Sequence, residues 1–143
     1  MAFSAKTEYG LIALIDLADA HGTGALLQTG DICRRHGIPL RYLEQMLTGL
    51  RKAGLLTSIR GPRGGFQLAL NPDNITVADV VAALDGSSNT EPQREPDDPA
   101  FLVLAALEQE LEASKEALLS ATTLAQLLRE HDALKQPLPM FYI

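Results

Sequence analysis

The order of elements in the first half of the chain constrains its fold more than any other feature. Two segments with apolar residues at helical spacing are separated by the short turn Gly37-Ile38-Pro39. Gly54 lies where a C-terminal cap of the second helix is expected. Residues 55–60 and 66–70 then have the composition of short strands, joined by the tip Arg60-Gly61-Pro62-Arg63-Gly64-Gly65. This order predicts a helix-turn-helix followed by a β-hairpin wing.

Apolar spacing and capping residues give the expected bounds of the first three helices. The first helix is expected from Ser4, its N-cap, to Ala20. The helix-turn-helix is expected to consist of a short helix at residues 31–36, with Thr29 as its N-cap, and a longer helix at residues 39–53. In such a pair the second helix is the one that can enter the major groove of DNA.

Beyond the hairpin the pattern predicts three more helices. Thr76 and Asp79 have the spacing of a capping box and open a helix that ends near Leu84. A long helix follows an acidic loop, and a last helix, capped by Thr123, is expected to end near Arg129. The fold class is therefore mainly α with a small β-hairpin wing. The apolar stripe of the long helix consists of Leu104, Leu107, Leu111 and Leu118.

The charge of the chain is divided unevenly between its two halves. The net charge is -6, which for a uniform chain argues against nucleic-acid binding. Residues 1–66, however, hold eight Lys and Arg against five Asp and Glu, a charge of +3, whereas residues 67–143 hold four against thirteen, a charge of -9. The two halves are expected to have different partners.

Composition also bears on the compartment and on catalysis. The single cysteine, Cys33, excludes a disulfide framework within one chain and fits a reducing cytoplasm. No apolar stretch approaches the length of a membrane span, and the N-terminal segment lacks the pattern of a signal peptide. We expect a soluble cytoplasmic protein. An enzyme is not expected, because the sequence contains no phosphate loop, metal-ligand cluster or nucleophile–base pattern.

DNA binding requires cations that neutralise phosphates and side chains that reach base edges. Three groups of side chains in this sequence have that chemistry. The candidates for phosphate contacts are Lys6, Arg51 and Lys52. The candidates for base edges, in the first turns of the recognition helix, are Arg41, Tyr42, Glu44 and Gln45. The wing contributes Arg60 and Arg63, since arginine can enter a narrow minor groove. A solvated hairpin without function is the alternative for the wing arginines.

The chain resembles the Rrf family of winged-helix transcriptional regulators over nearly its whole length. The resemblance implies a homodimer joined through the long helix, with two wings and two recognition helices on a palindromic operator. It also implies that Glu44 and Arg60 read bases. The expected organisation is a DNA-binding domain at 1–86, an acidic loop at 87–99, dimerisation and final helices at 100–133 and a tail at 134–143. The matching stretches are 4–9, 37–39, 42–45, 50–55, 58–65 and 75–79, with a weaker match at 122–124.

Many members of that family bind an iron–sulfur cluster through three cysteines in the loop before the long helix. This chain has none there, and the anionic side chains of its loop, more suited to a hard cation, are expected to be solvated. Glu8 matches a non-cysteine ligand position of some members, and Cys33, beside basic residues, is open to a lowered pKa and redox sensing. A surface role for Glu8 and packing for Cys33 are favoured. No metal or cofactor is expected, and the three histidines are taken as surface residues. The loop acids are Glu91, Glu95, Asp97 and Asp98.

The chain ends in an apolar tail, Phe141-Tyr142-Ile143, which either docks on its own body or is captured by another protein. This ending resembles that of the cysteine metabolism repressors of the family, which also lack the cluster cysteines. The resemblance implies a complex with cysteine synthase, in which Ile143 enters the substrate pocket of the enzyme and O-acetylserine competes for it.

The leading interpretation is a homodimeric DNA-binding repressor that controls cysteine metabolism without a cluster. One alternative changes only the sensor, to a redox or iron–sulfur input through Glu8, Cys33 or unrecognised ligands. Another is an interaction adaptor that does not bind DNA, which would account for the acidic second half. Salt-dependent DNA affinity separates the adaptor from the regulator.

Overall fold

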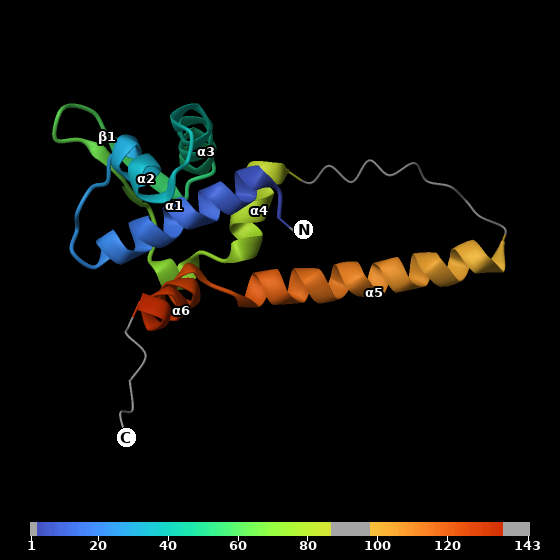
Figure 1. The fold of residues 1–143 in the computed structure, drawn as a ribbon. Coiled ribbons are helices and arrows are strands. Elements are labelled where there is room, and N and C mark those ends of the chain that lie inside the picture. The colour runs from blue at the N-terminus through green and yellow to red at the C-terminus, as the bar shows by residue number, and fades with distance from the viewer. Residues whose placement is uncertain (1–2, 87–97, 136–143) are drawn as a thin grey trace, which may run out of the picture.

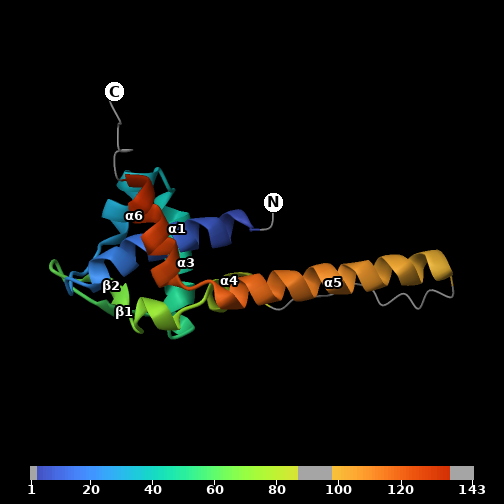
Figure 2. The same cartoon turned by 90° about the horizontal axis from the view of Figure 1, so that it is seen from below.

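The computed structural model describes residues 3–86 and 98–135 (Figure 1). Most of the elements form a body around the first helix, and one long helix extends away from that body as a rod (Figures 1 and 2). The expected class, mainly α with a small hairpin, is confirmed. The elements are α1 (Ala5–His21), α2 (Thr29–His36), α3 (Leu40–Lys52), β1 (Leu56–Ile59), β2 (Gly65–Leu68), η1 (Pro72–Asn74), α4 (Val77–Asp85), α5 (Pro99–Ala121) and α6 (Leu124–Lys135).

Helix α1 is at the centre of the body, where it contacts α3, α4, α6 and β2. Its Leu14 and Leu17 are buried, and they belong to one core cluster with Leu43 and Leu47 of α3 and Leu124 of α6. Each of these leucines contributes about 1.5–3 kcal/mol to folding through removal of its apolar surface from water. The central position of α1 therefore fixes α3 relative to the rest of the body.

Local capping explains where several helices begin and end. The Ser4 hydroxyl accepts a hydrogen bond from the Thr7 amide at 3.1 Å, which confirms Ser4 as the N-cap of α1. Helix α3 ends where Gly54 adopts a φ of +83°, a conformation that favours glycine, and the Leu55 amide donates to the Leu50 carbonyl at 3.0 Å. The predicted capping box at the start of α4 is also present.

The wing is an antiparallel hairpin in which Leu56 pairs with Leu68 and Ile59 with Gly65. The segment before α2 adds a short third pairing, because Leu27 exchanges backbone hydrogen bonds with Phe66 at 2.8 and 3.0 Å. This pairing is possible only with glycine at position 65, where an added Cβ would lie 2.6 Å from the Leu27 carbonyl oxygen. The wing is thus held against the helix-turn-helix.

Two of the expected helix boundaries are wrong. Thr29 is not the N-cap of α2 but its first residue, and Gln28 occupies the cap position without a side-chain hydrogen bond to the helix. The Leu27 pairing holds the preceding backbone extended, so the helix starts directly after Gln28. Helix α6 runs to Lys135 rather than to Arg129, because the residues between are ordinary helix formers with no glycine or proline to stop them.

Helix α5 differs from the other helices because it lacks a covered apolar face. Leu119, close to its C-terminal end, is buried, whereas every residue from Pro99 to Leu118 is exposed. Its end is tied to the body by the Val77 amide, which donates to the Thr122 carbonyl at 2.8 Å. Although α5 is long, none of the described helices is both long and apolar enough to cross a membrane.

Candidate nucleic-acid interface

Helix α3 has two chemically distinct faces. Leu43, Leu47 and Leu50 are fully buried against the core, which orients the helix. The side chains predicted to read bases lie on the other face, and Tyr42 among them has 56% of its surface exposed. Because an α-helix turns 100° per residue, the buried leucines fix which residues face outward. The predicted base-reading residues, all exposed, are Arg41, Tyr42, Glu44 and Gln45.

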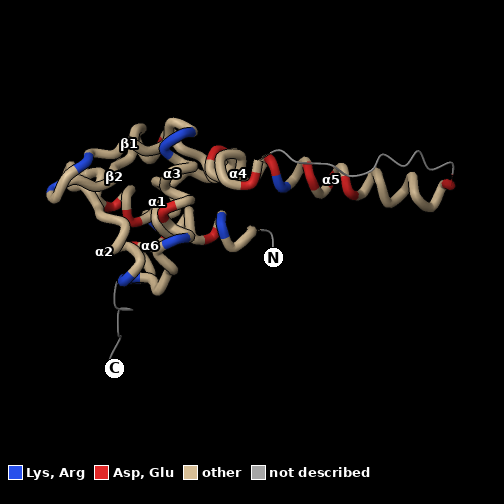
Figure 3. Tube along the Cα trace, turned by 90° about the horizontal axis from the view of Figure 1, so that it is seen from above, with Lys and Arg blue, Asp and Glu red and all other residues tan. Residues whose placement is uncertain are grey.

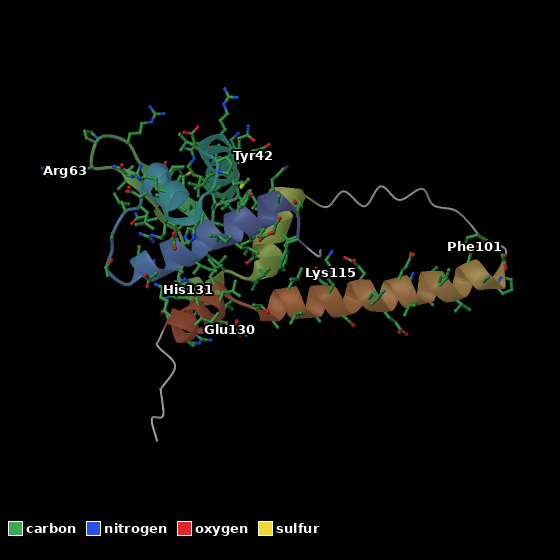
Figure 4. All side chains as sticks on the ribbon, in the orientation of Figure 1. Tyr42, Arg63, Phe101, Lys115, Glu130 and His131 are labelled. Atoms are coloured by element: carbon green, nitrogen blue, oxygen red, sulfur yellow. The ribbon has the colours of Figure 1, made fainter. Side chains whose placement is uncertain are left out.

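The tip of the wing presents its two arginines to solvent. Arg60 and Arg63 are exposed, and Figure 4 shows Arg63 at the outer end of the hairpin. The tip is tightly folded: the Gly64 amide donates to the Gly61 carbonyl at 2.9 Å, and a Cβ at Gly64 would overlap the Ile59 carbonyl oxygen. Glycine is therefore required at position 64, because this buried position has no room for a side chain.

Sequence reasoning missed a residue that supports this tip. The side-chain Nε2 of Gln28 donates to the Pro62 carbonyl at 3.2 Å, which connects the tip to the start of α2. A shallow hollow between the two is lined by Gln28, Thr29 and the glycines of the tip. No local sequence pattern predicts this contact, because it joins residues that are 34 positions apart.

The candidate cations are largely free of acidic neighbours. Arg51 donates a long hydrogen bond of 3.4 Å to the Ser58 hydroxyl, between the end of α3 and β1. By contrast, Arg34 and Arg35 of α2, which were not among the candidates, are paired with Asp31 and Asp16. Within residues 3–86 and 98–135, the candidates without any ion pair are Lys6, Arg41, Arg51, Lys52, Arg60 and Arg63.

The structure brings the wing and α3 together, and it places Lys6 on a third element, α1. Basic residues lie on the wing and on α3, while the projecting α5 carries mainly acidic ones (Figure 3). Arg63 and Tyr42 lie on the side of the body away from α6 (Figure 4). Lys6 is exposed in the first turn of α1, and none of its hydrogen bonds within the described ranges connects it to α3 or the wing.

Comparison with known proteins decides the family. The model of the Rrf2 family, described as an iron-dependent transcriptional regulator, matches residues 3–130. The chain belongs to the Rrf2 family. The transcriptional regulator CymR of Bacillus subtilis is 38% identical over 143 residues, the whole length of both chains. The regulator IscR of Aliivibrio salmonicida is 45% identical over 87 residues, which are 61% of this chain and 51% of that one. The chain thus matches about half the length of this relative.

Solved structures of this family have the same fold. The structure of CymR from B. subtilis, described as its global cysteine regulator, has a TM-score of 0.78 and 33% identity and covers 91% of this chain and 98% of its own. The structure of T. potens IscR has a TM-score of 0.80 and 31% identity, with coverages of 99% and 97%. The winged-helix architecture and the long helix are therefore common to Rrf2 proteins with different names.

A buried acid in this Rrf2 chain ties α1 to the end of α2. The side chain of Asp16 is 5% exposed and lies 2.7 Å from Nε2 of His36 and 3.2 Å from the guanidinium of Arg35. His36 is exposed at the surface, as expected, but one nitrogen of its ring is paired with this acid. A carboxylate on the apolar face of α1 signals that a partner exists, but its identity depends on tertiary structure. The contact fixes the helix that precedes the recognition helix.

Cys33 lies on the buried face of α2. Burial raises the pKa of its thiol, the negative charge of Glu44 raises it further, and Arg34 opposes them. The packing interpretation is confirmed, and the lowered pKa considered from the sequence is wrong because burial outweighs the nearby cation. A neutral, buried thiol is a poor nucleophile at neutral pH.

The residues of this chain do not fit the three-cysteine cluster site of other Rrf2 members. The only cysteine of the sequence is buried in the core, and Glu8 is exposed on α1. In the part of the chain that the structure describes, no three His, Cys, Asp or Glu side chains group as metal ligands. Asp98 instead caps α5, where it accepts from the Ala100 amide at 3.0 Å. Outside the described residues lie the other loop acids, Glu91, Glu95 and Asp97, and the tail residues Phe141, Tyr142 and Ile143.

Proposed function

We propose that this chain binds double-stranded DNA as a homodimer, with α3 in the major groove and the wing at the adjacent minor groove. The observation that carries the proposal is the pairing, on one side of the body, of a polar α3 face with a glycine-tipped wing whose arginines have no acidic partner among the described residues. The membership in a family of transcriptional regulators supports the same function.

Each candidate side chain has a chemical role in this arrangement. Arg41 can donate two hydrogen bonds to guanine, Glu44 can accept from cytosine, and Gln45 can pair with adenine. Tyr42 offers a hydroxyl and an aromatic face beside them. Arg60 and Arg63 reach into the minor groove, where a narrow groove concentrates negative potential. Three further cations neutralise phosphates and so set affinity rather than sequence preference. These are Lys6, Arg51 and Lys52.

The exposed apolar residues of α5 support the dimer. Soluble monomers rarely expose a long continuous apolar stripe, and α5 exposes Leu104, Leu107, Leu111 and Leu118 by 50–67% each. A second copy of α5 would cover this stripe and give an isologous interface with two-fold symmetry. Two copies of the DNA-binding part, residues 3–86, related in this way match a palindromic operator.

Selection of operator fragments from genomic DNA, followed by titration at several salt concentrations, tests the proposal. We expect the logarithm of the binding constant to fall linearly with the logarithm of salt concentration, because bound cations release counterions from the phosphates. Absence of salt-dependent binding would contradict the proposal and favour the interaction adaptor.

We propose further that the protein represses genes of cysteine or sulfur metabolism in the cytoplasm. The support is the full-length similarity to CymR, whose structure is described as that of a global cysteine regulator. Transcript levels in a strain lacking the gene test this. Derepression of sulfur-assimilation genes in cysteine-rich medium is the expected result, and unchanged transcripts would contradict it.

We propose cysteine synthase as the partner of the tail residues Phe141, Tyr142 and Ile143. The support is the resemblance of the final residues to those of cysteine metabolism repressors. Pull-down of the enzyme by the full chain and by a chain without its last four residues tests the contact. Recovery only by the full chain, abolished on addition of O-acetylserine, is expected. Equal recovery would favour a tail that docks on its own body.

A further inference from the structure

The last turn of α4 makes two hydrogen bonds to the first turn of α1. None of the residues proposed to contact DNA takes part in them. The Asp85 carboxylate accepts the Ser4 hydroxyl at 2.8 Å on one oxygen and the Thr7 hydroxyl at 2.7 Å on the other. Ser4 and Thr7 are the N-cap and the third residue of α1, so one carboxylate binds both hydroxyls of that first turn. Figure 1 shows the end of α4 beside the start of α1.

The position of Asp85 is unfavourable unless it serves this contact. Asp85 is the last residue of α4, where the negative end of the helix dipole repels a carboxylate. The same carboxylate lies at the N-terminus of α1, where the dipole is positive and attracts it. The cost at one helix is thus offset at another that lies 78–81 residues away in the chain.

The residue before it, Leu84, fills a notch between α1 and α3. A Cβ added at Gly10 of α1 would lie 2.5 Å from one methyl of Leu84, and a Cβ added at Gly49 of α3 would lie 3.6 Å from the other. Consecutive residues of α4 therefore contact the first half of α1 and the C-terminal half of α3. Together they set where the start of α1 lies relative to the recognition helix.

We propose that Asp85 is a positioning residue for DNA binding: its carboxylate holds the first turn of α1 so that Lys6 meets a phosphate while α3 occupies the groove. Lys6 is exposed between the two hydroxyl-bearing residues and forms no ion pair within the described ranges. The inference rests on the proposed DNA binding.

A double-mutant cycle on operator affinity tests it with the full-length protein. Asp85→Ala and Lys6→Ala are each expected to weaken binding about three- to tenfold, the usual size of coupled effects. The double variant should bind no more weakly than the weaker single variant. Asp85→Ala already removes the phosphate contact of Lys6, so deleting the Lys6 side chain as well causes no further loss. Asp73→Ala is the matched control, since it removes the same charge from an exposed site where the carboxylate makes no hydrogen bond among the described residues.

A conservative pair separates positioning from general stability. Thr7→Val removes the hydroxyl with little change of volume and should weaken operator binding as Asp85→Ala does. Thr7→Ser keeps the hydroxyl donor and should bind the operator as tightly as the parent protein. Affinities are compared after circular dichroism shows equal helix content. Should Asp85→Ala not fold, Asp85→Asn takes its place in the cycle, and failure of both to fold would overturn a specific positioning role.

Results that would overturn the positioning role of Asp85 differ from those that would overturn DNA binding itself. Additive losses in the cycle, no loss with Lys6→Ala, or equal losses with Asp85→Ala and Asp73→Ala would overturn the inference while the parent chain still binds its operator. Failure of the parent chain to bind DNA with salt dependence would instead overturn the proposed function.

Discussion

The reading head, residues 3–86, and the helix α5 differ in where their apolar side chains lie. In the head, leucines of α1 and α3 are buried in one core, and most exposed residues of α3 and the wing are polar or charged, with Leu40 and Ile59 as single exposed apolar side chains. On α5, large apolar side chains from Phe101 to Leu118 remain exposed beside glutamates. The core of the head is completed within the same chain by Leu119 and Leu124, whereas the apolar stripe of α5 is covered by no described residue of this chain.

The largest expected effect comes from charging that face. Leu107→Asp with Leu111→Asp should convert the dimer to a monomer, because two carboxylates would be buried unpaired at the interface. Affinity for a palindromic operator should then fall by about 10²–10⁴, since the second head loses its effective concentration. Sedimentation equilibrium measures the loss of the dimer, and fluorescence anisotropy of labelled operator DNA measures the loss of affinity.

The matched control places the same charges on the opposite face of α5. Gln109 and Ala113 are exposed and lie about 200° around the helix from the two leucines. Gln109→Asp with Ala113→Asp should therefore leave the dimer intact. Dissociation by the control pair as readily as by the leucine pair would remove the distinction between the two faces.

The second expected effect concerns the wing. Arg60→Ala with Arg63→Ala should weaken operator binding by about tenfold or more and reduce the salt slope by about one for each phosphate that is no longer neutralised. The exposed Arg129 of α6, away from the wing, is the control. If Arg129→Ala changes affinity and slope as much as the wing variant, the cations act only through net charge.

The third expected effect tests the shape of the wing rather than its charge. Gly64→Ala should destabilise the fold by about 1–3 kcal/mol, because the new methyl overlaps the backbone at Ile59. Gly22→Ala is the control: its φ is -65° and open space surrounds the position, so its effect should stay within about 0.5 kcal/mol. Thermal unfolding measures both, and equal stabilities would mean that the tip tolerates a side chain.

The smallest expected effect is a chemical one inside the head. Burial holds the pKa of Cys33 above its ordinary value, so the thiol stays protonated at neutral pH. Alkylation of the folded protein at pH 7 should be about tenfold slower than alkylation of the urea-unfolded chain. Equal rates would reopen a redox role for this cysteine.

Local signals in the sequence were sufficient for most of the fold. Ser4, the glycine after α3 and the Thr76–Asp79 pair mark helix ends through hydrogen bonds to near neighbours, and the structure has all of them. The start of α2 was misplaced because Leu27 pairs with Phe66, a contact that no window around Thr29 contains.

The same limit applies to the candidate site. Exposure of the α3 residues followed from the spacing of the buried leucines, whereas the supports of the site depend on contacts between distant segments. Asp16 with His36, Gln28 with Pro62 and Asp85 with Ser4 join residues that are 20, 34 and 81 positions apart. Only the fold brings such pairs together, so sequence reasoning named the surface but not what holds it in place.

Binding of a palindromic operator by a dimer is tested most simply by sedimentation of the protein with the selected operator, at low and at high salt. We predict two chains on each duplex at low salt, dissociation of the complex at high salt, and persistence of the dimer when the DNA is released. One chain per duplex, or a complex that is indifferent to salt, would contradict this prediction.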